Sequence, residues 1–138
     1  MYNMPMKISK KYLEICAKLL KDCDPSLADG RIRDRFYKTL IEDLKTYYED
    51  QEKILIKFCE KDSDENPIIR TNEKNEKTYT FSPENAPKVE EEILKLNKEQ
   101  TEISCDQPEK IKELIENTTY KPKVGETIII DELLVEIK

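Results

Sequence analysis

The sequence predicts an α+β fold that is mostly helical, and three observations support this prediction. Hydrophobic residues make up 37% of the chain and charged residues 39%, which favours helices with narrow apolar faces over a thick, layered core. Residues 31–61 contain neither glycine nor proline, and their apolar side chains recur at helical spacing. Segments rich in β-branched and aromatic residues are few and short. With 138 residues, we expect a single domain.

The N-terminal part, residues 1–61, is predicted to be an antiparallel helical hairpin. Residues 1–7 are expected to form an extended arm, because Pro5 does not fit the interior of a helix. Ser9 is the expected N-cap of a first helix that ends near Asp22. The connection that follows is short and contains a proline, so the second helix should return alongside the first.

The second helix of this hairpin is predicted to be long, covering residues 30–61, with Asp29 as its N-cap. At 1.5 Å per residue it would extend over roughly 45 Å, which is longer than a small domain is wide. Its apolar side chains are spaced to lie on one face. They are Ile32, Phe36, Leu40, Leu44, Tyr47, Ile54, Leu55 and Phe58. We therefore expect this helix to be the element around which the rest of the chain is arranged.

The remaining part, residues 62–138, is predicted to begin with a small antiparallel β-hairpin. Residues 68–71 and 78–81 are rich in β-forming side chains and flank a polar loop. A hairpin alone is marginally stable in water, so it needs support from the helices or from a third strand. Residues 101–105 alternate between polar and apolar side chains and are the candidate for that strand.

Further short helices are expected around these strands. Ser82 and Pro83 mark the start of one that ends near Lys98. Its core-facing residues are predicted to be Val89, Ile93, Leu94, Leu96 and Asn97. Another helix should start near Pro108, with Ile111, Leu114 and Ile115 turned inward. For residues 127–137 the triple isoleucine favours a strand, whereas the later spacing favours a helix, and we choose a terminal helix. Its predicted core face consists of Ile130, Leu133, Leu134 and Ile137.

The charge of the chain argues against a direct contact with nucleic acid or with a membrane. Residues 1–60 hold 12 basic and 11 acidic side chains, whereas residues 61–138 hold 12 basic and 19 acidic ones, so the net charge of −6 comes from the second half. A protein that binds duplexes would present a basic face. There is no apolar run of about 18 residues that would span a membrane and no apolar signal-peptide core at the start. We expect an intracellular, cytoplasmic protein.

The composition offers little support for catalysis, a cofactor or a metal site. There is no histidine, the most common general base. The two glycines are too few for a phosphate-binding loop. The four cysteines are not clustered as zinc ligands. Asp62, Asp64 and Asn66 have the spacing of calcium ligands, but the required glycine and final glutamate are missing. We therefore expect a protein that is not an enzyme.

Three groups of residues are candidates for contact with a partner protein. The arginines Arg31, Arg33 and Arg35 open the long helix and suit an acidic partner. The alternative is that they pair with nearby acids of the same chain. Tyr47 and Tyr48 lie in the middle of the helix, where core packing is the alternative. The consecutive acids Glu90, Glu91 and Glu92 suit a basic partner, or form a solvated helix face, but they point in different directions and cannot converge on one ion.

Several segments resemble a family of short proteins from phages and prophages of Gram-positive bacteria. The segments are 12–20, 31–36, 79–81, 89–96 and 130–134. The resemblance implies a small accessory phage protein that acts by binding, and it supplies no catalytic residues. One expected role is inhibition of a host protein, for example a nucleic-acid-binding defence protein, through the acidic half of the chain. The alternative is an assembly or tail protein that oligomerises through the long helix.

Overall fold

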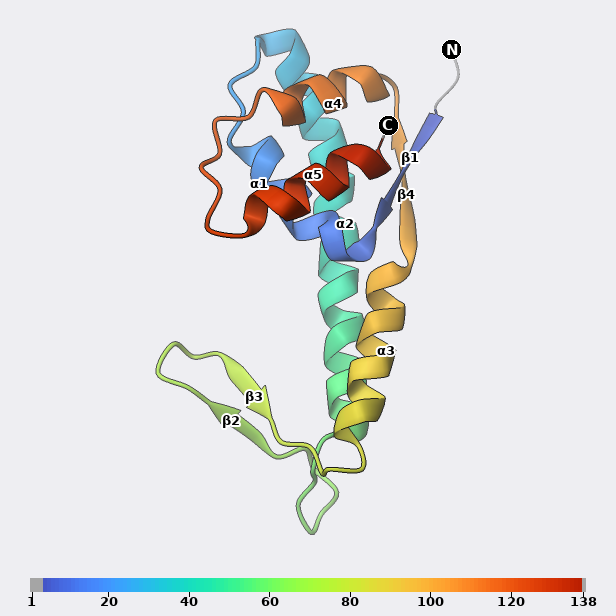
Figure 1. Ribbon diagram of the computed structural model, residues 1–138, viewed down its shortest axis with the longest axis vertical. Helices are drawn as coiled ribbons and strands as arrows, with labels where there is room; N and C mark the ends of the chain where they lie inside the picture. The colour runs from blue at the N-terminus through green and yellow to red at the C-terminus, as the bar shows by residue number, and fades with distance from the viewer. Residues whose placement is uncertain (1–3, 138) are drawn as a thin grey trace. The chain divides into compact units, whose positions relative to one another are not determined.

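The computed structural model describes residues 4–137 and confirms the predicted α+β, mostly α fold (Figure 1). This part of the chain contains five α-helices and two antiparallel sheets of two strands each. The helices are α1 (Leu13–Lys21), α2 (Leu27–Phe58), α3 (Ala86–Lys98), α4 (Pro108–Glu116) and α5 (Glu126–Glu136). The strands are β1 (Met4–Ser9), β2 (Ile69–Thr71), β3 (Lys77–Tyr79) and β4 (Gln100–Cys105).

The chain divides into two compact units that share the continuous helix α2. Unit 1 consists of Met1–Thr46 and Lys98–Lys138, and unit 2 of Tyr47–Asn97. The compositional boundary that the sequence indicated after residue 61 lies inside unit 2 and does not coincide with this division. The reason is that α2 is one uninterrupted helix, and different segments of the chain pack along its two halves.

The sheet of unit 1 pairs the N-terminal strand with a strand almost one hundred residues later. Strand β1 is antiparallel to β4, with Met6 opposite Ile103 and Ile8 opposite Thr101. Residues 4–9 of the expected extended arm are therefore a strand, and the start of the arm lies outside the described residues. The prediction that residues 101–105 complete the β2–β3 hairpin is wrong, because this strand pairs with β1 in a separate sheet.

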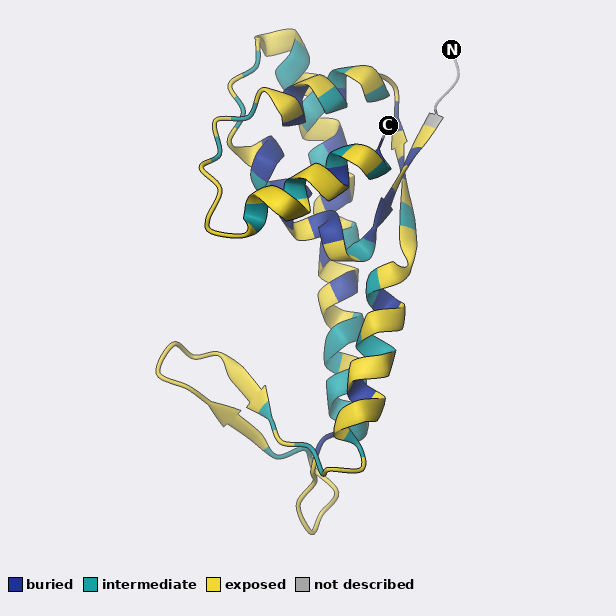
Figure 2. Cartoon of the chain, viewed as in Figure 1, coloured by how far each residue is buried: buried dark blue, intermediate teal, exposed yellow. Residues whose placement is uncertain are grey.

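The core of unit 1 lies between this sheet and helices α1, α2, α4 and α5 (Figure 2). Helix α1 packs against α4 and α5, and α5 also contacts β1. The fully buried side chains are aliphatic, apart from one thiol, as expected for a core driven by the hydrophobic effect. They are Ile8, Leu13, Cys16, Leu19, Leu20, Leu40, Ile103, Ile111, Ile115 and Leu133.

Two of the predicted helix caps differ from those observed. Ser9 precedes a short 3₁₀ turn, Lys10–Tyr12, and its side chain makes no capping hydrogen bond. Its hydroxyl instead donates to the carboxylate of Glu136, because a partner from α5 lies within reach. The long helix begins at Leu27, ahead of the predicted cap Asp29, and the amide of Asp29 donates to Oγ of Ser26 at 3.3 Å.

Unit 2 consists of the C-terminal half of α2, the β2–β3 hairpin and α3. The hairpin is held at its base by the backbone bonds from Glu60 N to Thr80 O and from Ile68 N to Glu60 O. Helix α3 begins at Ala86, three residues after the predicted first helical position, Pro83. It follows a turn in which the amide of Asn85 donates to Oγ of Ser82, the residue predicted as the cap. The side chain of Asn85 in turn donates to the carbonyl of Phe58 at the end of α2. These bonds join the three elements of the unit.

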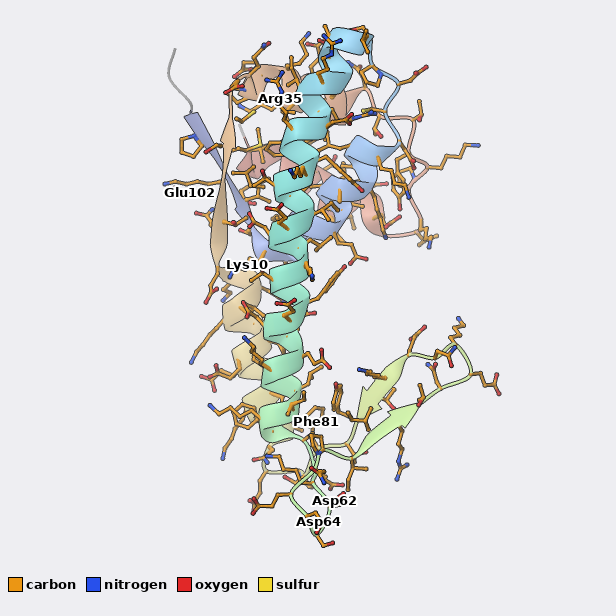
Figure 3. All side chains as sticks on the ribbon, turned by 180° about the vertical axis from the view of Figure 1, so that it is seen from behind. Lys10, Arg35, Asp62, Asp64, Phe81 and Glu102 are labelled. Carbon is orange, nitrogen blue, oxygen red and sulfur yellow. The ribbon has the colours of Figure 1, made fainter. Side chains whose placement is uncertain are left out.

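The hairpin and the connection before it contain two loops of the same construction. In the first, Oδ1 of Asp62 accepts hydrogen bonds from the amides two and four residues later, each at 2.9 Å. In the second, Oδ1 of Asn72 makes the same two bonds at the same distance. The carboxylate that suggested a calcium ligand thus binds its own backbone, and Figure 3 shows Asp62 and Asp64 in this loop. Such Asx turns stabilise a tight bend without a metal.

The backbone conformation of these two loops predicts that a glycine substitution stabilises one loop more than the other. Glu65 and Asn75 occupy the same loop position with φ of 62° and 59°. Asparagine tolerates this left-handed conformation better than glutamate. We expect Glu65→Gly to stabilise its loop by about 0.5–1 kcal/mol and Asn75→Gly by less. Amide hydrogen exchange in the two loops measures the difference. A larger gain from Asn75→Gly would contradict it.

The C-terminal residues form the predicted helix and are tied to the N-terminal elements. The hydroxyl of Tyr12 donates to Glu132 at 2.8 Å, and the amide of Ser9 donates to Glu136 at 2.9 Å. Burial, together with the bond to Glu132, raises the pKa of Tyr12. Leu133 and Ile137 are buried as expected from their spacing. Helix α5 is thereby fixed over the sheet end and α1.

Candidate functional site

The arginines at the start of α2 are drawn mainly into contacts with their own chain. Nε of Arg33 donates to Asp34 at 2.9 Å, and Nη1 donates to the carbonyl of Cys23 at 3.3 Å. Arg33 therefore connects α2 to the end of the α1 segment. Its hydrogen bond to the Cys23 thiol, followed by the one to Asp34, raises the pKa of Arg33. Arg35 is exposed and lies 3.6 Å from Asp106. Arg31 is exposed as well. The structure thus does not gather the three guanidinium groups at one point, and it supports pairing with nearby acids for two of them.

A shallow cavity of about 210 Å³ lies beside Arg35, between α2 and the end of β4. Its lining includes Phe36, Ser104, Cys105 and Asp106. Burial is the main cause that raises the pKa of the Cys105 thiol. A protonated thiol is a poor nucleophile, and the nearby cation is already compensated by Asp106. The cavity therefore has neither an activated nucleophile nor an uncompensated charge.

The two adjacent tyrosines of α2 point in different directions, as expected for neighbours on a helix. Tyr47 is buried, and its hydroxyl is bonded to Oδ1 of Asn97 and to the amide of Gln51. Tyr48 is 44% exposed, with its ring centroid 5.9 Å from that of Tyr47. The placement of Tyr47 supports core packing within unit 2. Tyr48 is the member of the pair that another molecule can reach.

The acidic residues of α3 surround an exposed leucine. Glu90 and Glu91 are exposed, and Lys95 lies 3.4 Å from Glu91 and 3.6 Å from Glu92. The prediction that Leu94 faces the core is wrong, since this side chain is 51% exposed. The buried face of α3 is formed by Val89 and Leu96, and a side chain two residues from Leu96 points away from that face.

The negative charge of the chain is divided unequally between the two units. Unit 2 (Tyr47–Asn97) contains 13 acidic and 8 basic residues, which gives a net charge of −5. Unit 1 contains 17 acidic and 16 basic residues, which gives −1. The sequence had assigned the excess to residues 61–138, but residues 98–138, with 6 basic and 10 acidic side chains, belong to unit 1, where the 10 basic and 7 acidic side chains of residues 1–46 offset most of that charge. The charge density of unit 2 is accordingly much higher than that of unit 1.

No metal-binding arrangement occurs among residues 4–137: no three side chains of His, Cys, Asp or Glu are grouped to hold an ion. The four cysteines are free thiols. Cys16 is fully buried, and this burial raises the pKa of its thiol to about 12. Cys16 is therefore protonated at neutral pH and acts as a small apolar core residue.

The sequence analysis did not identify the exposed apolar side of α5 as a candidate surface, although the spacing of its residues indicates such a side. Ile128, Ile129 and Val135 of α5 are exposed, and Val124 in the preceding loop is exposed too. The assignment of the leucines of this helix to the core already implied that Ile128 and Val135 lie on the opposite side. The missing information was whether another part of the chain covers that side.

Comparison with known proteins adds no relative: no family model, no curated protein and no solved structure matches this chain. Within the described range, none of the helices has the length and apolar character needed to cross a membrane.

Proposed function

We propose that this chain is a non-enzymatic protein-binding protein whose unit 2 docks against a basic surface of another protein. The observation that carries the proposal is the concentration of negative charge in unit 2, −5 in Tyr47–Asn97 against −1 in the larger unit 1. A compact acidic unit attracts a basic partner at long range and orients it on approach. The cytoplasm of a bacterium is the proposed location.

Helix α3 provides the proposed centre of this surface. Leu94 is exposed between Glu90 and Glu91, which lie one turn before it on the same side of the helix. An exposed apolar side chain flanked by charges suits an interface in which burial of the leucine supplies affinity and the acids supply specificity. The resemblance to phage and prophage proteins supports a host protein as the partner, such as a nucleic-acid-binding defence protein.

The alternative, self-assembly through the long helix, has less support. The apolar residues Phe36, Leu40, Leu44 and Tyr47 on α2 are buried within the chain itself. This part of the apolar face has little area left for a second copy, and Ile54, Leu55 and Phe58 farther along the helix are half-buried. We therefore place the binding of a different protein first.

The test is capture of proteins from a lysate of a Gram-positive bacterium on the immobilised full chain. We expect basic proteins to be retained in about 50 mM salt and released in about 500 mM salt, because salt screens contacts between exposed charges. The double variant Glu90→Gln, Glu91→Gln should bind the captured protein roughly three- to tenfold more weakly at low salt, since each exposed charge contributes at most about 1 kcal/mol.

A matched control removes the same charge from unit 1. The variant Glu102→Gln, Glu109→Gln neutralises two exposed carboxylates on β4 and α4, of which Figure 3 labels Glu102. We expect it to retain the captured protein like the unaltered chain. An equal loss of binding in both double variants would mean that net charge alone, not the surface of α3, causes the effect. Binding that persists in high salt in the unaltered chain and in both variants would contradict the proposal.

A further inference from the structure

Helix α5 is apolar on two opposite sides, and only one of them is covered by unit 1. Leu133 is fully buried and Ile137 nearly so, whereas Ile128 is 66% and Val135 68% exposed. An amphipathic surface helix normally turns polar side chains toward solvent. Figure 2 shows exposed residues, in yellow, along the uncovered side of α5. This side has the composition of a contact face.

The exposed side chains lie on one line along the helix. At about 100° per residue, Ile128 and Val135 are separated by two turns and point in directions that differ by only about 20°. Leu133 points roughly 140° away from Ile128, toward the core. Ile129, 40% exposed, points about 100° away from Ile128 and lies at the edge of this surface, and the exposed Val124 precedes the helix. We call the surface formed by Ile128 and Val135, with Ile129 at its edge, the α5 stripe.

The charges of α5 are all negative: the helix contains Glu126, Asp131, Glu132 and Glu136 and no basic residue. The three glutamates are bonded within unit 1. Glu126 accepts from the hydroxyl of Tyr120 at 2.7 Å, Glu132 from Tyr12 and Glu136 from Ser9.

Asp131 is different, because it is exposed and its carboxylate makes no hydrogen bond or ion pair with any residue in the described part of the chain. It lies one turn from both Ile128 and Val135, within the stripe. A partner that covers the aliphatic side chains must therefore also face this carboxylate. Leaving it unpaired in a buried contact would cost free energy, so a cation opposite it is required.

We propose that the α5 stripe docks an amphipathic helical segment of another protein, with aliphatic side chains along one face and lysine or arginine beside them. A second copy of this chain fits poorly. The midpoint of Ile128 and Val135 falls next to Asp131, so a two-fold axis through the stripe would bring the two Asp131 carboxylates together. Like charges in contact suppress such pairing. The stripe lies in unit 1, so this docking is separate from the acidic surface of unit 2.

The probe for the test is a synthetic helical peptide with leucines at i, i+3, i+4 and i+7 and lysines on both flanks of this face. Its binding to the full chain is followed by amide chemical shifts in NMR spectra. We expect the shifts to concentrate on residues 124–135. A peptide with glutamates in place of the lysines should bind at least tenfold more weakly, because it places acids against Asp131.

Variants separate the stripe from general stickiness of the chain. Ile128→Ser with Val135→Ser should weaken binding of the lysine peptide about tenfold or more, and Asp131→Lys should reverse the preference between the two peptides. Leu27→Ser, at an exposed leucine at the start of α2, is the control and should leave binding unchanged. The proposal is overturned if neither peptide binds, if the shifts lie elsewhere, or if light scattering shows a dimer that Ile128→Ser dissociates.

Discussion

Replacing Leu133 by alanine is expected to lower the free energy of unfolding of the protein by about 2–5 kcal/mol, whereas Val135→Ala should change it by less than about 0.5 kcal/mol. The two positions lie two residues apart on α5. Leu133 is completely buried and Val135 is 68% exposed. Removing the buried side chain loses its transfer free energy and leaves a cavity, while truncating the exposed one does neither.

Urea unfolding followed by circular dichroism measures both variants. For a chain of this length, the Leu133→Ala change corresponds to a fall in Tm of roughly 5–20 °C. The comparison tests the orientation of α5, on which the α5 stripe depends. Similar small effects at both positions would mean that α5 does not dock on unit 1 through Leu133. A large effect at Val135 would mean that the stripe is covered.

The second large effect concerns pH. Full burial raises the pKa of the Cys16 thiol from 9.0 to about 12, so the unfolded chain loses this proton at lower pH than the folded chain. The contribution is fully present below pH 9 and declines as pH rises through the interval between the two values. The free energy of unfolding should fall by about 1 kcal/mol between pH 9 and 10, and by up to about 4 kcal/mol at pH 12.

Chemical denaturation at a series of pH values between 8 and 10 measures this decline. Tyrosines and lysines begin to titrate toward the upper end of this range, so the comparison with a variant that lacks the thiol isolates the contribution of Cys16. The variant Cys16→Ala should flatten the decline, although it lowers stability at neutral pH. Cys23→Ala removes a half-buried thiol and serves as the control that keeps the Cys16 contribution. A decline of the same slope in Cys16→Ala would show that other groups cause it.

The candidate surfaces were predictable to different degrees. Glu90 and Glu91 are exposed as acids on an amphipathic helix should be, and local pattern was enough to place them. Leu94 was assigned to the core because leucine is usually buried. In the structure, Val89 and Leu96 form the buried face of α3, and Leu94 lies outside it. From the sequence, Arg33 appeared available to a partner. In the structure its guanidinium donates a hydrogen bond to the carbonyl of Cys23, ten residues earlier. Such a contact depends on the path of the chain between two helices.

The sequence by itself determined the helices, because their periodicity and breakers are local properties. The uninterrupted stretch of α2, the Ser82 start before α3 and the terminal helix α5 were all read from spacing within about 10–30 residues. The strands β2, β3 and β4 were also recognised from their side chains. The pairing of β2 with β3 was also predicted, from the polar loop between them, whereas the tertiary structure alone decided that β4 pairs with β1, since the alternation within one strand does not encode a distant partner.

Strand β4 pairs with β1 and not with the β2–β3 hairpin. This long-range pairing determines which segments belong to unit 1. It also decided which charges belong together, so that the acidic excess falls on Tyr47–Asn97. Finally, the spacing within α5 predicted that Leu133 lies on the core face, but only the packed structure shows whether the opposite face is covered. Among residues 4–137, no distant residue buries that face, so Ile128 and Val135 are exposed.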